Sequence, residues 1–220
     1  MKNLASKFLS ELERGKIEAC VKEVEKTTSG EIVPMVVSAS YHYPMSNMIG
    51  GLIFALLIAV GVTLAYSLQK SWGGVSALDL WLFPAVFAVA FLLSHELVKR
   101  VAWLKRLFVT KAEIAEEVEE AALTSFYRNG LNNTRDRTGI LIFISVFERR
   151  AFVLADEGIN AKVDKEAWQE VVDTVVDGIK RRRQADGICE ALRRCGELIH
   201  EHFPIKADDT DELDNLIVED

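Results

Sequence analysis

Long apolar runs are the strongest pattern along this chain, and they predict a pair of membrane helices. No charged side chain occurs from Tyr43 to Gln69, and the segment 78–98 carries charges only near its ends. About 20 apolar residues are enough for a helix to cross roughly 30 Å of hydrocarbon. We therefore predict two transmembrane helices, at about 47–68 and 78–98, joined as a hairpin.

Outside the hairpin, apolar residues recur at the spacing of amphipathic helices. This spacing predicts helices over 4–26, 111–127, 165–183 and 185–202. Within the first segment, Gly15 is predicted to break or cap the helix. Asp164 is well placed as the amino-terminal cap of the third.

Runs rich in β-branched residues predict three strands, at 31–38, 139–146 and 151–155. The run 139–146 (GILIFISV) is apolar at almost every position, as expected of a central strand buried on both faces. Pro34 cannot donate a hydrogen bond to a neighbouring strand, so the first strand is expected at a sheet edge or with a bulge.

The order of these elements predicts how the chain is organised. Neither soluble segment has enough strands for a sheet of its own. We therefore predict one α/β domain, a small central sheet flanked by helices, which is interrupted after its first strand by the two-helix transmembrane hairpin. The predicted parts are residues 1–42 and 107–205 for the domain, 43–106 for the hairpin, and 206–220 for an acidic, disordered tail.

Composition and charge agree with a chain divided in this way. Half of the residues are apolar, yet 27% are charged, and the net charge is −7. Residues 207–220 carry seven acids and no base, and the rest of the chain has 26 of each. Nothing in this balance favours nucleic acid, whereas the apolar runs make the lipid bilayer a partner.

The distribution of bases predicts the orientation of the hairpin. Several bases follow the second apolar segment: Lys99, Arg100, Lys105, Arg106 and Lys111. The positive-inside rule places them on the cytoplasmic side. The sequence thus predicts a multi-pass protein of the inner (cytoplasmic) membrane with both termini in the cytoplasm. Cys20, Cys189 and Cys195 match neither a disulfide framework nor a metal site, so we expect reduced core residues.

The soluble segments resemble the TPM domain, a family named from thylakoid phosphatase-like, photosystem repair and acetylcholine-receptor modulator proteins. Residues 28–32 (TSGEI) are similar to the family's T-x-G-E-I pattern. Residues 133–142 resemble its D-x-x-G-[VI]-L strand. Residues 148–150 and 156–164 resemble its arginine-bearing turn, its glycine-containing loop and the acidic start of the next helix. The resemblance implies an α/β fold, with reports of divalent-cation binding and phosphatase activity in the family.

Asp136, Asp156 and Asp164 are the candidate metal ligands. They lie at the ends of strands or at a helix start, where loops bring carboxylates together, and Ca²⁺ or Mg²⁺ prefers such oxygen ligands. Each aspartate also has a purely structural interpretation: Asp136 as a turn residue, Asp156 as a strand-end residue and Asp164 as a helix cap.

Two functions are compatible with these residues and with the resemblance. The first is a membrane-tethered, non-catalytic module that binds or modulates another membrane protein or a second copy of itself, as the resemblance implies for repair and modulator proteins. The alternative is a divalent-cation-dependent phosphatase. The sequence has no P-loop, no H-E-x-x-H and no G-x-S-x-G pattern, so no catalytic residue is predicted.

Overall fold

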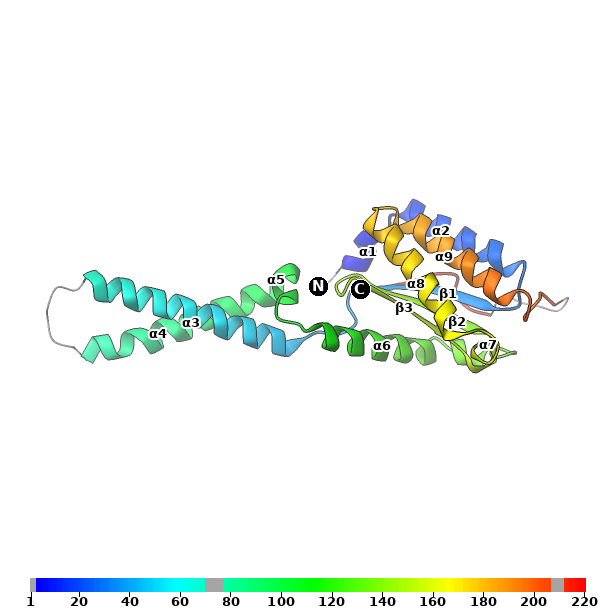
Figure 1. Cartoon of the computed structure of the whole chain (residues 1–220). Helices are drawn as coiled ribbons and strands as arrows, with labels where there is room; N and C mark the ends of the chain where they lie inside the picture. Colours follow the sequence, from blue (N-terminus) through cyan, green and yellow to red (C-terminus); the bar gives the residue numbers. More distant parts are fainter. Residues whose placement is uncertain (1–2, 70–76, 207–211) are drawn as a thin grey trace. The chain divides into compact units, whose positions relative to one another are not determined.

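The chain folds into two compact units. The structure, a computed structural model, describes residues 3–69, 77–206 and 212–220. One unit, here the α/β unit, comprises Met1–Tyr41 with Ile114–Asp220, and the other, the hairpin unit, comprises His42–Glu113. The α/β unit is therefore assembled from segments on both sides of the hairpin (Figure 1).

A four-stranded mixed sheet forms the centre of the α/β unit. Its strands are β1 (Glu31–Val37), β2 (Gly139–Ser145), β3 (Arg150–Ala155) and β4 (Ile217–Glu219), in the order β3-β2-β1-β4. β1 is parallel to both β2 and β4, and β2 is antiparallel to β3. Every residue of β1 and β2 is buried, which explains why both sequences are nearly continuous apolar runs. The predicted α/β class with a central sheet is confirmed.

Helices cover both faces of this sheet (Figure 1). Alternate residues of the central strands, including Ile32 and Ile142, join one core cluster with apolar residues of three helices. These helices are α2 (Glu11–Glu25), α8 (Lys165–Lys180) and α9 (Gln184–Ile199). The opposite face, which bears Met35 and Phe143, is covered by α6 (Lys111–Arg128). Two short helical segments, η1 (Leu131–Asn133) and α7 (Glu157–Asn160), also belong to the unit.

The amino-terminal helix breaks earlier than predicted. It consists of α1 (Leu4–Phe8) and α2, so the break falls at Leu9 and Ser10 rather than at Gly15. The Ser10 hydroxyl accepts from the Glu13 N–H while the Glu13 carboxylate accepts from the Ser10 N–H. This capping box fixes the start of α2. Gly15 lies inside α2, where an added Cβ would meet open space, so nothing there demands a glycine.

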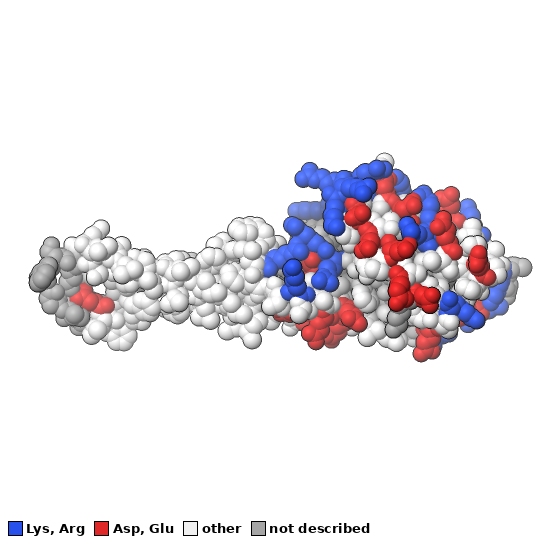
Figure 2. All heavy atoms as spheres, in the orientation of Figure 1, with Lys and Arg blue, Asp and Glu red and all other residues white. Residues whose placement is uncertain are grey.

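The hairpin unit consists of α3 (Pro44–Gln69), α4 (Ala77–Arg100) and the short α5 (Ala102–Arg106). By length and composition, Pro44–Gln69 and Asp79–Arg100 could each cross a membrane. Small residues of α3, namely Gly51, Ala55 and Ala59, are among its buried positions. The side chains around them are mostly apolar and exposed, and Figure 2 shows few charged atoms along α3 and α4.

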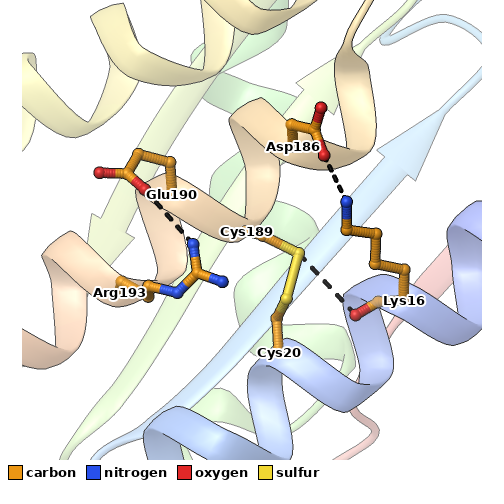
Figure 3. Close-up of a disulfide and its surroundings, with 6 residues drawn as sticks. All are labelled: Lys16, Cys20, Asp186, Cys189, Glu190 and Arg193. Atoms are coloured by element: carbon orange, nitrogen blue, oxygen red, sulfur yellow. Dashed lines mark hydrogen bonds and ion pairs between the residues drawn. A yellow bond between two sulfur atoms is a disulfide. The ribbon is translucent and has the colours of Figure 1, made fainter.

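A disulfide joins two of the cysteines, so the prediction of three reduced residues is wrong. Cys20 of α2 and Cys189 of α9 are bonded across the core, with their Cα atoms 5.7 Å apart (Figure 3). The two cysteines are 169 residues apart in the sequence, so their pairing depends on the fold and is not evident from their spacing. Cys195 is free, and complete burial raises the pKa of its thiol to about 12.

The carboxyl-terminal segment is not wholly disordered, contrary to the prediction for residues 206–220. Residues 217–219 form β4, which pairs with Met35 to Val37 of β1, whereas residues 207–211 lie outside the described part of the chain. Consequently β1 is not an edge strand. Pro34 pairs with Ile142 of β2 and lies just before the stretch that β4 covers, so its missing N–H costs no pairing with β4.

Candidate functional site

Three of the segments that resemble the TPM family, residues 28–32, 133–142 and 156–164, meet at the amino-terminal ends of β1 and β2, whereas residues 148–150 lie at the other end of β2. Thr138, just before β2, donates its hydroxyl to the Ser29 carbonyl (3.0 Å), and the Glu31 N–H donates to the Thr138 carbonyl (3.2 Å). Thr138 is 1% exposed, so this link is part of the core. The first two segments are therefore held side by side.

Arg137 brings in the third segment, which follows β3. Its Nε lies 3.0 Å from Asp156 Oδ2, and its backbone has a φ of 58°, in the left-handed region. Opposite it, Gly158 packs so closely that an added Cβ would lie 2.6 Å from the Arg137 carbonyl oxygen. Only glycine fits such an approach, which explains the glycine of this loop. We call this group of residues 136–138 and 156–158 the loop cluster.

The three predicted metal ligands have different surroundings. Asp136 pairs with Lys206 (2.5 Å), and the buried Asp156 caps α7, accepting from the Glu157 N–H (2.7 Å). Asp164 precedes α8 as predicted, but its side chain makes no capping hydrogen bond. The described residues contain no group of three or more His, Cys, Asp or Glu side chains placed to hold a metal ion. The three aspartates do not form a ligand set in this structure, and cation binding by them stays a prediction.

At the opposite end of the sheet, a buried carboxylate joins two turns. Glu148, in the turn between β2 and β3, is 1% exposed. It accepts hydrogen bonds from the Ser145 hydroxyl and from the Ser40 N–H (3.0 Å). Because Ser40 follows β1, this contact fixes the chain just before it leaves the α/β unit at Tyr41.

A pocket of about 520 Å³ lies at this end, beside the carboxyl-terminal ends of the parallel strands β1 and β4. Carboxyl ends of parallel strands are a common place for binding sites in α/β folds. Its polar lining comes from the segment after β1, from α6 and from the chain end: Ser38, Ser40, Tyr41, Glu117, Glu120, Thr124, Arg128, Glu219 and Asp220. We call it the α6 pocket.

Acidic groups dominate the α6 pocket. Arg128, the arginine in the described part of its lining, forms ion pairs of 2.6 and 2.7 Å with both oxygens of Glu219. Asp220 accepts from the Ser38 hydroxyl (2.6 Å), and this hydrogen bond lowers the pKa of its carboxyl. Glu117 and Glu120 come from one side of α6. Arg128 is paired with Glu219, and the other charged side chains of the described lining, Glu117, Glu120 and Asp220, are all acidic.

The α6 pocket was not predicted from the sequence. The acids of α6 match the solvated face of an amphipathic helix, and that spacing alone does not distinguish the glutamates that line a pocket. Part of the lining depends on β4, which falls in the segment predicted to be disordered. The spacing of Glu117, Glu120 and Thr124 along one stripe of α6 is the only local signal.

Fold and site together define the class of this protein: a mixed α/β domain with a charged loop cluster at one end of its sheet, interrupted by an apolar helical hairpin. The sequence model of the TPM domain matches residues 101–198. Residues 101–198 of the chain therefore match the TPM domain family, as the resemblance of the sequence predicts. The resembling segments after β1 lie within the matched region, whereas residues 28–32 precede it.

A solved structure supports the same fold. The chain is similar to the BA42 protein from the psychrophilic bacterium Bizionia argentinensis, determined by NMR, with a TM-score of 0.57 and 19% sequence identity. The match covers 97% of this chain and 96% of that chain. At this identity the likeness supports the fold alone. None of the curated proteins matches the chain.

Proposed function

We propose that this chain is a membrane-tethered TPM module that binds the basic juxtamembrane segment of another membrane protein, or of a second copy, in the α6 pocket. The observation that carries the proposal is the position of this acidic pocket: Tyr41, the last residue of the α/β unit before the hairpin, lines it. A partner in the same membrane can therefore reach it.

The chemistry of membrane proteins supports this choice of partner. Lys and Arg are enriched in the short cytoplasmic segments that flank membrane helices. The α6 pocket presents Glu117, Glu120 and Asp220 to such a segment. Opposite charges at an interface favour encounter and exclude partners of the wrong sign. The module needs no reaction of its own to act in this way.

The tether in this proposal is the hairpin, with α3 and α4 crossing the inner membrane and the α/β unit in the cytoplasm. The bases that follow α4 support this orientation through the positive-inside rule. The Cys20–Cys189 disulfide favours the opposite orientation, with the α/β unit outside the cytoplasm, because disulfides persist mainly in oxidising compartments. We give the bases more weight, because in the cytoplasm the same two side chains can remain buried thiols. The redox state is then a test of the orientation.

Photocrosslinking tests the proposed site. Thr124, an exposed residue lining the α6 pocket, is replaced by benzoylphenylalanine in the full chain, and crosslinking is induced in native membranes. We expect an adduct with a membrane protein that is lost in Glu117→Gln/Glu120→Gln. The matched control is Glu116→Gln/Glu119→Gln, which removes the same charge from residues of α6 outside the pocket. Equal adducts in both double variants would reject the pocket as the binding site.

A phosphatase assay tests the alternative function, a divalent-cation-dependent phosphatase. Purified full-length protein is incubated with p-nitrophenyl phosphate, with and without Mg²⁺ or Ca²⁺. Our proposal expects no cation-dependent release of phosphate. Release that is abolished in Asp136→Ala, with the fold retained, would contradict a non-catalytic module and support the predicted metal ligands.

A further inference from the structure

The turn between α8 and α9 is strongly basic and exposed. Lys180, Arg181, Arg182 and Arg183 follow one another, and the side chains of the first two are 71% and 75% exposed. The acids near them are Asp177, 3.6 Å from Lys180, and Asp186, 2.8 Å from Arg183. Figure 2 shows Lys and Arg atoms gathered over this turn.

One arginine occupies an unfavourable backbone position there. Arg182 has a φ of 57°, in the left-handed region that glycine and asparagine adopt most readily after a helix. A charged residue at such a position is uncommon, and an observed outlier of this kind suggests a use for the side chain.

Contacts within the α/β unit place this turn at the end of the unit from which the chain leaves for the hairpin. Ser38, three residues before Tyr41, accepts from the Leu4 and Ala5 N–H groups at the start of α1. At the other end of α1, the Phe8 carbonyl accepts from Gln184, the first residue of α9 (3.1 Å). α1 thus connects the exit of the chain to the basic turn.

An apolar side chain stands beside these charges. Leu12, in the first turn of α2, is 83% exposed. One helical turn further along the same face, Lys16 is hydrogen-bonded to Asp186, which lies just beyond the basic turn. Arginines with an exposed leucine are the combination by which protein surfaces attach to a lipid interface.

We propose that this end of the α/β unit, formed by Leu12, Lys16 and residues 180–183, docks on the anionic lipid headgroups of the membrane in which the hairpin is held. The inference rests on the proposed membrane insertion of α3 and α4. Basic residues close to a membrane surface are attracted by anionic lipids, and the attraction falls within a Debye length. Such docking would fix how the α6 pocket is presented to membrane partners.

An environment-sensitive fluorophore at Leu12→Cys tests this contact. Selective labelling is feasible because Cys20, Cys189 and Cys195 are all buried, whether or not the first two form the disulfide. The full-length protein is reconstituted in vesicles of phosphatidylcholine, with or without phosphatidylglycerol, and emission of an NBD label is recorded. We expect higher emission with phosphatidylglycerol, and loss of the increase in 1 M NaCl, where the Debye length is about 3 Å.

Two matched variants decide the outcome. Arg181→Gln/Arg182→Gln is expected to weaken docking by roughly 30-fold, since each base contributes to attraction by anionic lipid. Arg193→Gln/Arg194→Gln removes the same charge from the middle of α9 and should retain the full response. Equal emission in neutral and anionic vesicles, or equal loss in both variants, would overturn the inference.

Flotation of the same vesicles separates this inference from the proposed membrane insertion. If the protein floats after carbonate extraction but the label shows no response to phosphatidylglycerol, only the docking inference fails. If carbonate releases the protein from the vesicles, the hairpin is not inserted and both ideas fail.

Discussion

Large apolar side chains are buried in one unit of this chain and exposed in the other. Ile32 and Ile140, in the sheet, are 0% exposed, whereas Leu57 of α3 and Leu92 of α4 are 63% and 69% exposed. In the α/β unit such side chains are removed from water by the fold itself. In the hairpin unit they form an exposed apolar surface, which the proposed membrane insertion would place in lipid. Burial of such side chains therefore stabilises the fold of the α/β unit, whereas their exposure in the hairpin unit favours an apolar environment around it.

Side-chain size should matter along a row of small residues on α3. Gly51, Ala55 and Ala59 lie four residues apart on α3 and are all buried. An added Cβ on Gly51 would lie 3.2 Å from the His95 Cα of α4. Small residues at this spacing let two membrane helices approach closely.

The largest expected difference between the units comes from deleting a buried side chain. Ile142→Ala leaves a cavity in the core cluster and should destabilise the α/β unit by about 2–5 kcal/mol. The measurement is denaturant unfolding of the full-length protein in detergent, followed by near-ultraviolet circular dichroism. Leu57→Ala, an exposed position of α3, is the control and should leave this transition unchanged. Similar losses of stability in both variants would contradict the difference between the two units.

Removal of the disulfide should affect only one unit. Cys189→Ser deletes the link between α2 and α9 and should lower the stability of the α/β unit by about 2–4 kcal/mol where the disulfide is formed. The helices α3 and α4 should keep their helical content, measured by far-ultraviolet circular dichroism after limited proteolysis. If Cys189→Ser is as stable as the wild type under both reducing and oxidising conditions, the disulfide contributes no stability.

Enlarging the seam of the hairpin should have a smaller effect. Ala59→Leu places three extra carbons at a position that is 0% exposed and should cost about 1–3 kcal/mol through overpacking. Unfolding of the hairpin in an SDS titration measures the change. Ala65→Leu, near the carboxyl-terminal end of α3 and exposed, serves as the control. No difference between the two would mean that α3 and α4 do not pack along Ala59.

The smallest expected effect concerns β4. In the folded chain the hydrogen bond from Ser38 lowers the pKa of Asp220 below its ordinary value of 3.8. A lowered pKa stabilises the attachment of β4 above that value, and this contribution is lost as the pH falls through the folded pKa. In the Asp220→Asn variant the amide proton of Ser38 should therefore exchange slightly faster than in the wild type at pH 6, as measured by hydrogen exchange. The wild type should approach the variant as the pH falls below 3.8 and through the lowered pKa, and a difference that grows on acidification would contradict this.

Long periodic or apolar segments are the parts of the fold that the sequence predicts well. The run 139–146 forms β2, and the apolar runs form α3 and α4, because burial or length leaves few alternatives. The start of α2 is less evident from sequence, although Ser10 and Glu13 form a capping box, because Gly15 is the more conspicuous helix breaker. β4 gives no periodic signal, because three residues among many acids are too short for one.

The candidate sites depend on contacts between distant segments, and so the sequence predicts them less well. The loop cluster is partly predictable, since Asp136 and Asp156 do lie in adjoining loops. Lys206, which pairs with Asp136, is 70 residues away in sequence and gives no signal. The link between Cys20 and Cys189 likewise depends on how α2 packs against α9, which no local pattern reveals.

Accessibility of two single positions tests the central claim that the hairpin spans the membrane with the α/β unit on the cytoplasmic side. Two variants are treated with a membrane-impermeant thiol reagent in right-side-out membrane vesicles: Leu68→Cys, 88% exposed at the carboxyl-terminal end of α3, and Leu12→Cys in the α/β unit. We predict labelling at residue 68 in sealed vesicles and at residue 12 only after permeabilisation. Labelling at residue 12 in sealed vesicles would contradict the account.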